Sequence, residues 1–271
     1  MRGLALVLLA LPGLALAQDA PAPRPEPPGE HRPAPRPQDA PAADPAAASA
    51  LPDPAPEQPE PATQPDEPPE PAGPPVHTTL RESDFDYAAC LMELTLLGAD
   101  FDEQAPIADA EQRDCGIDRP ILLRAPLPGI EIAGGAPMRC DTARQLAHWL
   151  RDFVRPAAAR LPGQPRLSGL EPGTTYQCRA TVGGEGAGGK LSEHAFGNAF
   201  DIAAFRFEDG SRIAVEPRAD SGDLQEAFQR AVRGAACLHF TTVLGPGANA
   251  AHDDHLHLDI KARRGGWRLC Q

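Results

Sequence analysis

The chain has 271 residues, a formal charge of -13 and 33 prolines. This acidic balance argues against a nucleic-acid ligand, because no basic surface would neutralise the phosphates. The composition changes sharply along the chain and divides it into three parts.

Residues 1–17, MRGLALVLLALPGLALA, have the layout of a secretory signal peptide. A single arginine precedes a run of leucine and alanine that ends on small residues, so we expect cleavage after Ala17. The run is short for a transmembrane helix, and no transmembrane domain is expected after cleavage. An uncleaved membrane anchor is the alternative.

Residues 18–77 are predicted to form a disordered linker rich in proline and alanine. Of the 33 prolines, 21 lie between Pro21 and Pro75, and apolar side chains larger than alanine are nearly absent there. Nothing in such a segment offsets the entropy lost on ordering the chain. We therefore expect an extended spacer. A proline-rich ligand for a partner domain is the alternative.

Residues 78–271 are predicted to form one folded domain, and all six cysteines of the chain lie in it. An even number of cysteines behind a signal peptide predicts up to three disulfides. The 15 possible pairings remain open. A cysteine metal site is disfavoured because no two cysteines have the C-x-x-C spacing. Together with the signal peptide, the disulfides predict secretion to the periplasm or the cell envelope.

Three helices are expected in the folded part. Residues 84–97 have apolar side chains at helical spacing and acidic residues at their start. A second helix is expected to run from Asp141, as its N-cap, to about Val154, before a stop at Pro162-Gly163. A third helix is expected over residues 223–236.

Strands are expected between and after these helices. Residues 119–135 predict two short strands broken by prolines, and residues 173–182 alternate well enough for another strand. The remaining strands are expected as a hairpin, residues 199–207 with 212–215, and a closing pair, residues 237–245 with 254–260. Since helices and strands do not alternate as βαβ units, the fold class is α+β, with a mainly antiparallel sheet and flanking helices.

Two short stretches contain four of the eight histidines: SEHAFGNAFD, residues 192–201, and HDDHLHLD, residues 252–259. A hydrolytic zinc site needs three protein ligands, an open position for water and a nearby group that moves a proton. The first stretch offers His194 and Asp201 as ligands, with Gly197 allowing a turn between them.

In the second stretch, strand alternation places His255 and His257 on one face together with Asp253 and Asp259, and the leucines on the other face. An isolated H-x-H pair is more often surface decoration than a ligand pair. The combination with the first stretch favours a metal site.

The pattern Ser192-x-His194-x-x-Gly197-x-Ala199-x-Asp201 resembles the S-x-H-x-x-G-x-A-x-D motif of the zinc D-alanyl-D-alanine carboxypeptidases. These peptidoglycan peptidases are grouped with lysostaphin-type enzymes and hedgehog domains. The region from about Thr78 onward resembles the bacterial extensin-like C-terminal domain, which is thought to belong to the same superfamily. The resemblance implies a hedgehog-like or D-Ala-D-Ala-peptidase-like fold.

The resemblance also implies roles for individual residues. His194, Asp201 and His257 would bind Zn2+. The general base would be Asp254 or His255, and we favour Asp254 because a carboxylate accepts a proton without becoming a cation beside zinc. His252 is a further candidate for the base.

Two more residues complete the expected site. An arginine on a strand before the metal motif helps to bind or polarise substrate in the family, which points to Arg179; an ordinary surface charge is the alternative. Ser192 would hydrogen-bond the substrate or a metal ligand. The six cysteines exceed the number usual in the carboxypeptidase relatives, so the shape of the cleft is open.

The sequence therefore favours a secreted zinc-dependent peptidase or amidohydrolase, of the D-Ala-D-Ala carboxypeptidase or peptidoglycan endopeptidase type. Its partner would be the peptide part of peptidoglycan in the cell wall. One alternative is a non-catalytic cell-wall-binding module on the same metal-binding scaffold. Another is a structural protein whose histidines bind nothing.

Overall fold

The computed structural model describes residues 73–182 and 189–271. The expected signal peptide and residues 18–72 of the expected linker lie outside these ranges. Helix α1, Val76–Thr79, includes the last two residues of the range assigned to the linker. Within the described ranges, no helix combines the length and the apolar character needed to cross a membrane.

The helices agree closely with the three expected ones. Helix α2, Asp84–Leu97, begins after Ser83, whose side chain accepts a hydrogen bond from the backbone N–H of Asp86. The other helical segments are α3 (Cys140–Trp149), the π-helical η1 (Leu150–Val154), α4 (Arg155–Ala158), η2 (Glu193–Phe196), α5 (Leu224–Ala236), η3 (Ala250–His252) and η4 (Arg264–Gly266).

The strands of residues 73–182 and 189–271 form three sheets. The largest has the order β12-β10-β11-β8-β7-β5, with β9 also paired to β8. Its strands are β5 (Glu131–Ile132), β7 (Leu167–Pro172), β8 (Ala199–Phe207), β9 (Arg212–Ala214), β10 (Thr242–Leu244), β11 (Leu256–Asp259) and β12 (Leu269–Cys270). The second sheet is β1-β4-β6, with β1 (Asp100–Glu103), β4 (Pro120–Ala125) and β6 (Ala136–Arg139). The third pairs β2 (Ile107–Ala108) with β3 (Gly116–Ile117).

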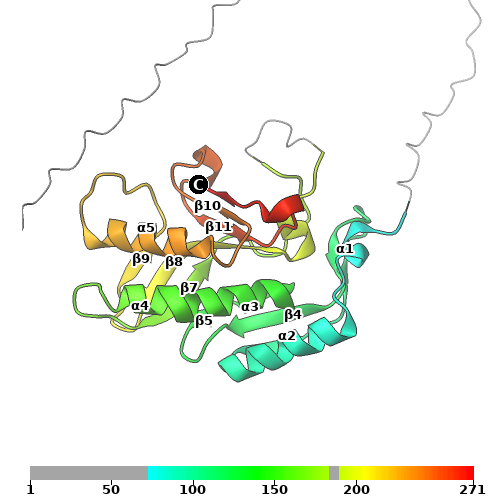
Figure 1. The fold of residues 1–271 in the computed structure, drawn as a ribbon, viewed down its shortest axis with the longest axis horizontal. Coiled ribbons are helices and arrows are strands. Elements are labelled where there is room, and N and C mark those ends of the chain that lie inside the picture. Colours follow the sequence, from blue (N-terminus) through cyan, green and yellow to red (C-terminus); the bar gives the residue numbers. More distant parts are fainter. Residues whose placement is uncertain (1–72, 183–188) are drawn as a thin grey trace, which may run out of the picture. The chain divides into compact units, whose positions relative to one another are not determined.

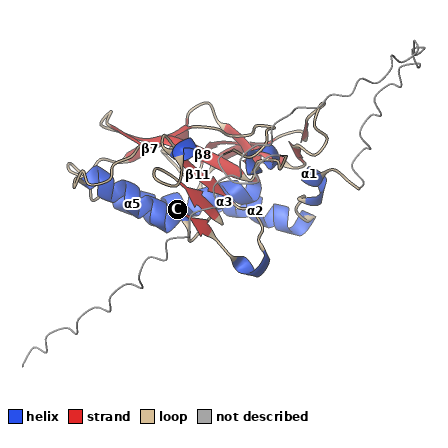
Figure 2. Ribbon diagram, turned by 90° about the horizontal axis from the view of Figure 1, so that it is seen from above, coloured by secondary structure: helices blue, strands red, loops and turns tan. Residues whose placement is uncertain are grey.

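Most strand pairs are antiparallel; the exceptions are β5 with β7 and β10 with β12. The fold is therefore α+β with mainly antiparallel sheets and flanking helices, as the sequence predicts. Figure 1 shows α3 and α5 running across the large sheet, and Figure 2 shows them on one side of strands β7, β8 and β11.

The main core lies between these helices and the large sheet. Trp149 of α3 is fully buried; its ring lies 6.2 Å from that of Phe205 in β8 and 6.4 Å from that of Phe240. Its indole N–H donates to the backbone carbonyl of Val232 in α5, 2.9 Å away, so this large side chain is buried without an unmet donor.

Alternation along β8 and β11 separates the core from a polar face. The core side chains are Phe200, Ile202, Leu256 and Leu258. Since successive strand residues point to opposite sides, Asp201, His257 and Asp259 all project from the other face. The large sheet is thus apolar toward the helices and carries a buried polar cluster on its far side.

Three disulfides close the fold: Cys90–Cys140, Cys115–Cys178 and Cys237–Cys270. They confirm the expected number and select one of the 15 pairings that six cysteines allow. Cys90–Cys140 joins α2 to α3. Cys237–Cys270 joins the end of α5 to β12.

Two local expectations are wrong. Asp141 is not the N-cap of the second helix, because α3 already begins at Cys140; the Asp141 carboxylate instead bonds Arg144 one turn later. Residues 173–182 contain no strand beyond an isolated bridge between Ala180 and Leu191. The strand in this region is β7, which ends at Pro172 because proline has no N–H to continue the ladder.

Candidate metal centre

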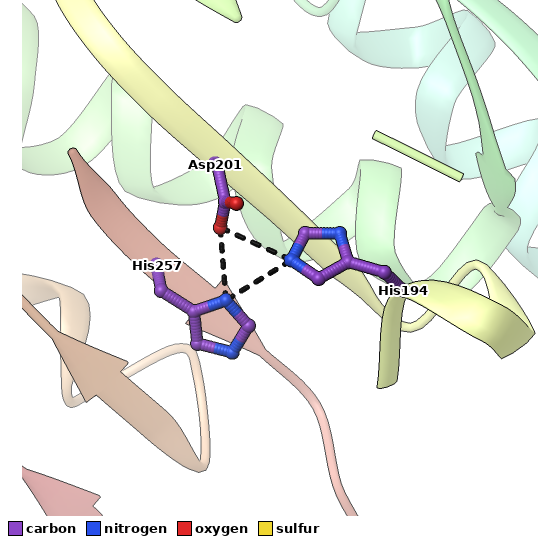
Figure 3. A group of neighbouring side chains, drawn as sticks. All are labelled: His194, Asp201 and His257. Carbon is purple, nitrogen blue, oxygen red and sulfur yellow. Dashed lines mark hydrogen bonds and ion pairs between the residues drawn. The ribbon is translucent and has the colours of Figure 1, made fainter. Parts of the chain in front are cut away.

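His194, Asp201 and His257 meet on the polar face of the large sheet (Figure 3). Asp201 Oδ1 lies 2.8 Å from His257 Nδ1 and 3.2 Å from His194 Nε2. The two ring nitrogens are 3.2 Å apart. His194 is fully buried and Asp201 is 1% exposed. Three potential ligand atoms therefore converge on one small buried volume.

The elements that carry these residues fix their positions. Asp201 and His257 face each other across the antiparallel β8–β11 ladder. His194 lies on the short helix η2, whose N-cap is Ser192 and whose C-cap is Gly197, with a left-handed φ of 66°. A Cβ at Gly197 would lie 2.4 Å from Cδ1 of Ile117, so the chain needs glycine to turn from η2 into β8.

The outer nitrogen of each imidazole has its own acceptor. His194 Nδ1 donates to the backbone carbonyl of Thr175, 2.6 Å away, because a carbonyl oxygen can only accept. His257 Nε2 lies 3.2 Å from Asp259 Oδ2 and donates to that carboxylate. These bonds orient both rings and direct His194 Nε2 and His257 Nδ1 toward Asp201, as the outer partners of metal-binding histidines do.

The cluster also shifts the acidities of its members. Burial would raise the pKa of Asp201, but hydrogen bonds from His194 and His257 outweigh it and hold that pKa well below its usual value. Burial would lower the pKa of His257, but the carboxylates of Asp201 and Asp259 outweigh it and raise the pKa to about 9. In a metal-free site at neutral pH, a proton on His257 Nδ1 therefore lies where a cation would have to bind.

The donor set fits a divalent metal of the zinc type. Two imidazole nitrogens and one carboxylate oxygen are a usual three-residue set for catalytic zinc, which leaves a further position open. Both imidazoles have the oriented outer hydrogen bonds that such sites show. The residues present thus fit a zinc site in three respects: the type of ligand atom, the number of ligands, and the hydrogen bonds that orient the two imidazoles.

A cavity of about 290 Å3 opens beside the cluster. Asp201 and His257 form part of its wall, whereas His194 does not line it. Its other ionisable or hydroxyl-bearing lining residues are Thr174, Arg179, Thr181, Ser192, Glu193, Thr242, His252, His255, Asp259, Lys261 and Arg263. A polar ligand in this cavity would reach the candidate metal centre directly.

His255 and Asp254 form a pair at the edge of this cavity. His255 Nδ1 lies 2.8 Å from Asp254 Oδ1, and its other nitrogen, Nε2, is 3.7 Å from Asp201 Oδ2. The Asp254 side chain is 92% exposed and does not line the cavity. Strand β11 begins only at Leu256, so the preceding turn sends Asp254 outward. His255, rather than Asp254, faces the ligand cluster.

His252 is a buried residue that lines the same cavity as His255. Its ring lies 5.2 Å from that of His255 and 5.8 Å from that of His257, and its Nδ1 is 2.7 Å from Asn249 Oδ1. Burial, reinforced by the neighbouring histidines, lowers the pKa of His252 to about 4. The neutral ring is therefore the form present at neutral pH.

Arg179 and Ser192 both line the cavity. The Arg179 guanidinium donates to Gln177 Oε1 and to the backbone carbonyl of Ala180, and no carboxylate of the described residues pairs with it. Ser192 is 6% exposed, and its hydroxyl accepts from the N–H of His194 at 3.4 Å. Arg179 is not on a strand; the Cys115–Cys178 disulfide anchors the preceding residue.

Two supporting groups have no motif of their own. From the sequence, Asp259 could be placed only on the same strand face as His257. Its hydrogen bond to His257 depends on side-chain geometry that the sequence does not show. Thr175 acts through its backbone carbonyl, which any residue could supply. Its residue type therefore does not predict this role. Lys261 and Glu193 form a 2.8 Å ion pair on the cavity wall, and this pair joins residues far apart in the sequence.

The arrangement is that of an α+β domain with a buried His-Asp-His cluster beside a polar cavity. The model of the family described as "Extensin-like protein C-terminus" matches residues 88–271. Because the match covers more than half of the chain, the chain belongs to this extensin-like family. No curated protein and no solved structure matches it.

Proposed function

We propose that His194, Asp201 and His257 bind one zinc ion and that the chain hydrolyses an amide bond in the peptide part of peptidoglycan. The convergence of the three ligand atoms, 2.8 to 3.2 Å from one another, carries the proposal. A bound zinc ion would supply a Lewis acid and an acidified water at the cavity. The remaining chemistry falls to residues of the cavity wall.

His255 is the group best placed to move a proton. Its Nε2 faces the ligand cluster, and Asp254 accepts from Nδ1 and thereby holds the ring. This is the carboxylate–imidazole arrangement that orients a histidine base in many hydrolases. We therefore propose His255 as the general base and Asp254 as its positioning residue, in place of the sequence preference for Asp254 as the base.

Arg179 and Ser192 are proposed to bind the substrate. The Arg179 guanidinium lacks a carboxylate partner among the described residues and lies on the cavity wall, so it can pair with a substrate carboxylate or a polarised carbonyl. The polar lining favours a peptide ligand rich in hydrogen-bonding groups over an apolar one.

The choice of peptidoglycan rests on the resemblance of the Ser192–Asp201 motif to the zinc D-Ala-D-Ala carboxypeptidases, and with it we propose a hedgehog-like or peptidase-like fold. Export to the periplasm or cell envelope is part of the proposal, and the three disulfides are compatible with it. The second candidate is a non-catalytic wall-binding module that keeps the metal.

Metal content and amide cleavage should be measured on the same full-length preparation. We expect about one zinc per chain, and mass spectrometry should detect shortened peptides after incubation with purified peptidoglycan fragments. The variant His255→Gln should keep zinc and lose cleavage, while His148→Gln, altered on the distant helix α3, should keep both. Zinc without cleavage in the parent chain would favour the binding module. Absence of both would exclude the proposal.

A further inference from the structure

A second cavity lies on the helix side of the large sheet. It has a volume of about 460 Å3 and is bounded by α5, β10, β12 and the loop after β9. Val243 lines this cavity, whereas its neighbours Thr242 and Leu244 line the cavity at the candidate metal centre. Since side chains alternate along a strand, the two cavities lie on opposite faces of β10. The second cavity is therefore separate from the first.

Three arginines gather around this cavity: Arg218, Arg230 and Arg233. Arg218 pairs with Glu216 at 2.7 Å, and Arg230 pairs with Glu226 at 2.5 Å. Arg233 has no carboxylate partner in the described part of the chain; its Nη1 donates to the backbone carbonyl of Pro246 at 2.7 Å. One guanidinium thus lacks a counter-ion.

Glu226 is not available to neutralise Arg233. Its carboxylate accepts from the N–H of Gly222 at 2.8 Å, from the Ser221 hydroxyl at 3.1 Å and from the N–H of Asp220 at 3.3 Å. It therefore holds the 220–222 turn as well as Arg230. Arg233 is therefore left without a carboxylate partner among the described residues.

Arg233 is also held in place and partly shielded from water. Its side chain packs against Gly245, where a Cβ would lie 3.3 Å from Cδ of the arginine. Burial, with the positive charge of Arg230 nearby, lowers the pKa of Arg233, so its cation is less stable here than in water. A bound anion would remove this penalty.

We propose that this cavity binds a carboxylate carried on a small apolar group, with Arg233 as the residue that holds the carboxylate. One uncompensated guanidinium suits a ligand with a single negative charge. A phosphate monoester carries about −1.5 to −2 charges, and Glu226 on the cavity wall would repel the excess. The apolar side chains of Pro217, Ala219 and Val243 provide the surface for the rest of the ligand.

The test uses the full-length chain carrying Arg179→Met and treated with a chelator, so that neither Arg179 nor a bound metal ion in the first cavity can hold the probe's carboxylate. Calorimetric titration should show binding of N-acetyl-leucine, and binding of the neutral N-acetyl-leucinamide should be weaker by about tenfold or more, the loss of one charge-assisted hydrogen-bonded pair. Inorganic phosphate should bind more weakly than N-acetyl-leucine. Equal binding of the acid and the amide, or tighter binding of phosphate, would overturn the proposal.

Variants locate the site. Arg233→Met should weaken binding of N-acetyl-leucine by about tenfold or more, whereas Arg166→Met, at a residue whose side chain is 82% exposed elsewhere on the surface, should leave it unchanged. Asp201→Asn should also leave it unchanged, because that residue faces the other cavity. Unchanged affinity in a folded Arg233→Met chain would refute the assignment.

If circular dichroism shows that Arg233→Met does not fold, the binding of N-acetyl-leucine to Arg230→Met tests the site instead. Arg230 is 68% exposed, so its replacement is compatible with the fold, and it adds positive charge at the cavity. We expect severalfold weaker binding of N-acetyl-leucine; an unchanged affinity in this variant would count against the site in the same way.

Discussion

His257 lies directly opposite Asp201 in the ladder between β11 and β8, and His257 Nδ1 is 2.8 Å from Asp201 Oδ1. A cross-strand pair of this kind is fixed by the register, because a slip of β11 by one residue would turn His257 to the core face, away from Asp201. The leucines and aromatic residues on that core face hold the register. The hydrophobic core thereby aligns two of the three proposed ligands.

Replacement of Asp201 by asparagine should abolish high-affinity zinc binding. The amide has nearly the same shape but no negative charge, so we expect the affinity for zinc to fall by more than about 100-fold, the upper end of the cost of losing an outer partner. Zinc retained after dialysis against a competing chelator measures the effect. Asp209→Asn, in an exposed turn, is the matched control. Equal zinc retention in Asp201→Asn and the parent would remove Asp201 from the site.

Asp259 should act on zinc through His257. Loss of its bond to His257 Nε2 frees the ring to rotate, so Asp259→Ala should weaken zinc binding by about 10- to 100-fold without abolishing it. Asp259→Asn, which keeps an acceptor oxygen, should fall between Ala and the parent. A graded series in zinc affinity supports a positioning role, and three equal affinities would contradict it.

Gly197→Ala should destabilise the domain through a steric clash as well as backbone strain. The added Cβ would meet Ile117 Cδ1 at 2.4 Å and the backbone nitrogen of Arg139 at 3.1 Å, at a φ of 66°. We expect a loss of about 2–5 kcal/mol in the free energy of unfolding, the sum of left-handed strain and overpacking. Gly210→Ala, with φ 83° and no atom within 4 Å, should cost only about 1–2 kcal/mol. Urea denaturation of both variants separates the steric clash from the backbone strain. Equal losses in the free energy of unfolding would show that the structure relieves the clash at Gly197.

The ion pair between Glu82 and Arg139 should contribute to stability because it is buried. Their side chains are 5% and 13% exposed, and the Arg139 guanidinium also donates to Asn198 Oδ1 at 2.8 Å, just before β8. Glu82→Ala leaves this guanidinium without a counter-ion and should cost about 3–5 kcal/mol. Glu208→Ala, at a pair of exposed side chains, should cost at most about 1 kcal/mol. Similar urea midpoints for the two variants would show that the buried pair contributes no more than the exposed one.

The local patterns of the sequence predicted much of the fold. Helix α2, the β8–β9 hairpin and helix α5 follow from periodicity and end signals that lie within each segment. The same alternation predicted that His257 and Asp259 share a face. These features depend on near neighbours, which a single sequence displays directly.

The errors arose where distant contacts decide the structure. Residues 173–182 alternate like a strand but are held by separate bonds, from the N–H of Gly173 to the carbonyl of Asp201 and from the N–H of Asp201 to the carbonyl of Thr174. The outward direction of Asp254 depends on where β11 begins. The second cavity, which Arg218, Arg230 and Arg233 line, combines α5 with residues that are distant from it in sequence, so no local pattern could reveal it.

The Cys115–Cys178 disulfide joins a segment beside the candidate centre to the residue before β3. Cys178 lies between Thr175, whose carbonyl orients His194, and Arg179 on the cavity wall. This segment has no continuous strand ladder; the disulfide supplements the isolated backbone bonds that hold it, such as the one from the N–H of Ser192 to the carbonyl of Arg179. A chain kept in a reducing compartment would offer zinc an incomplete centre and two competing cysteines.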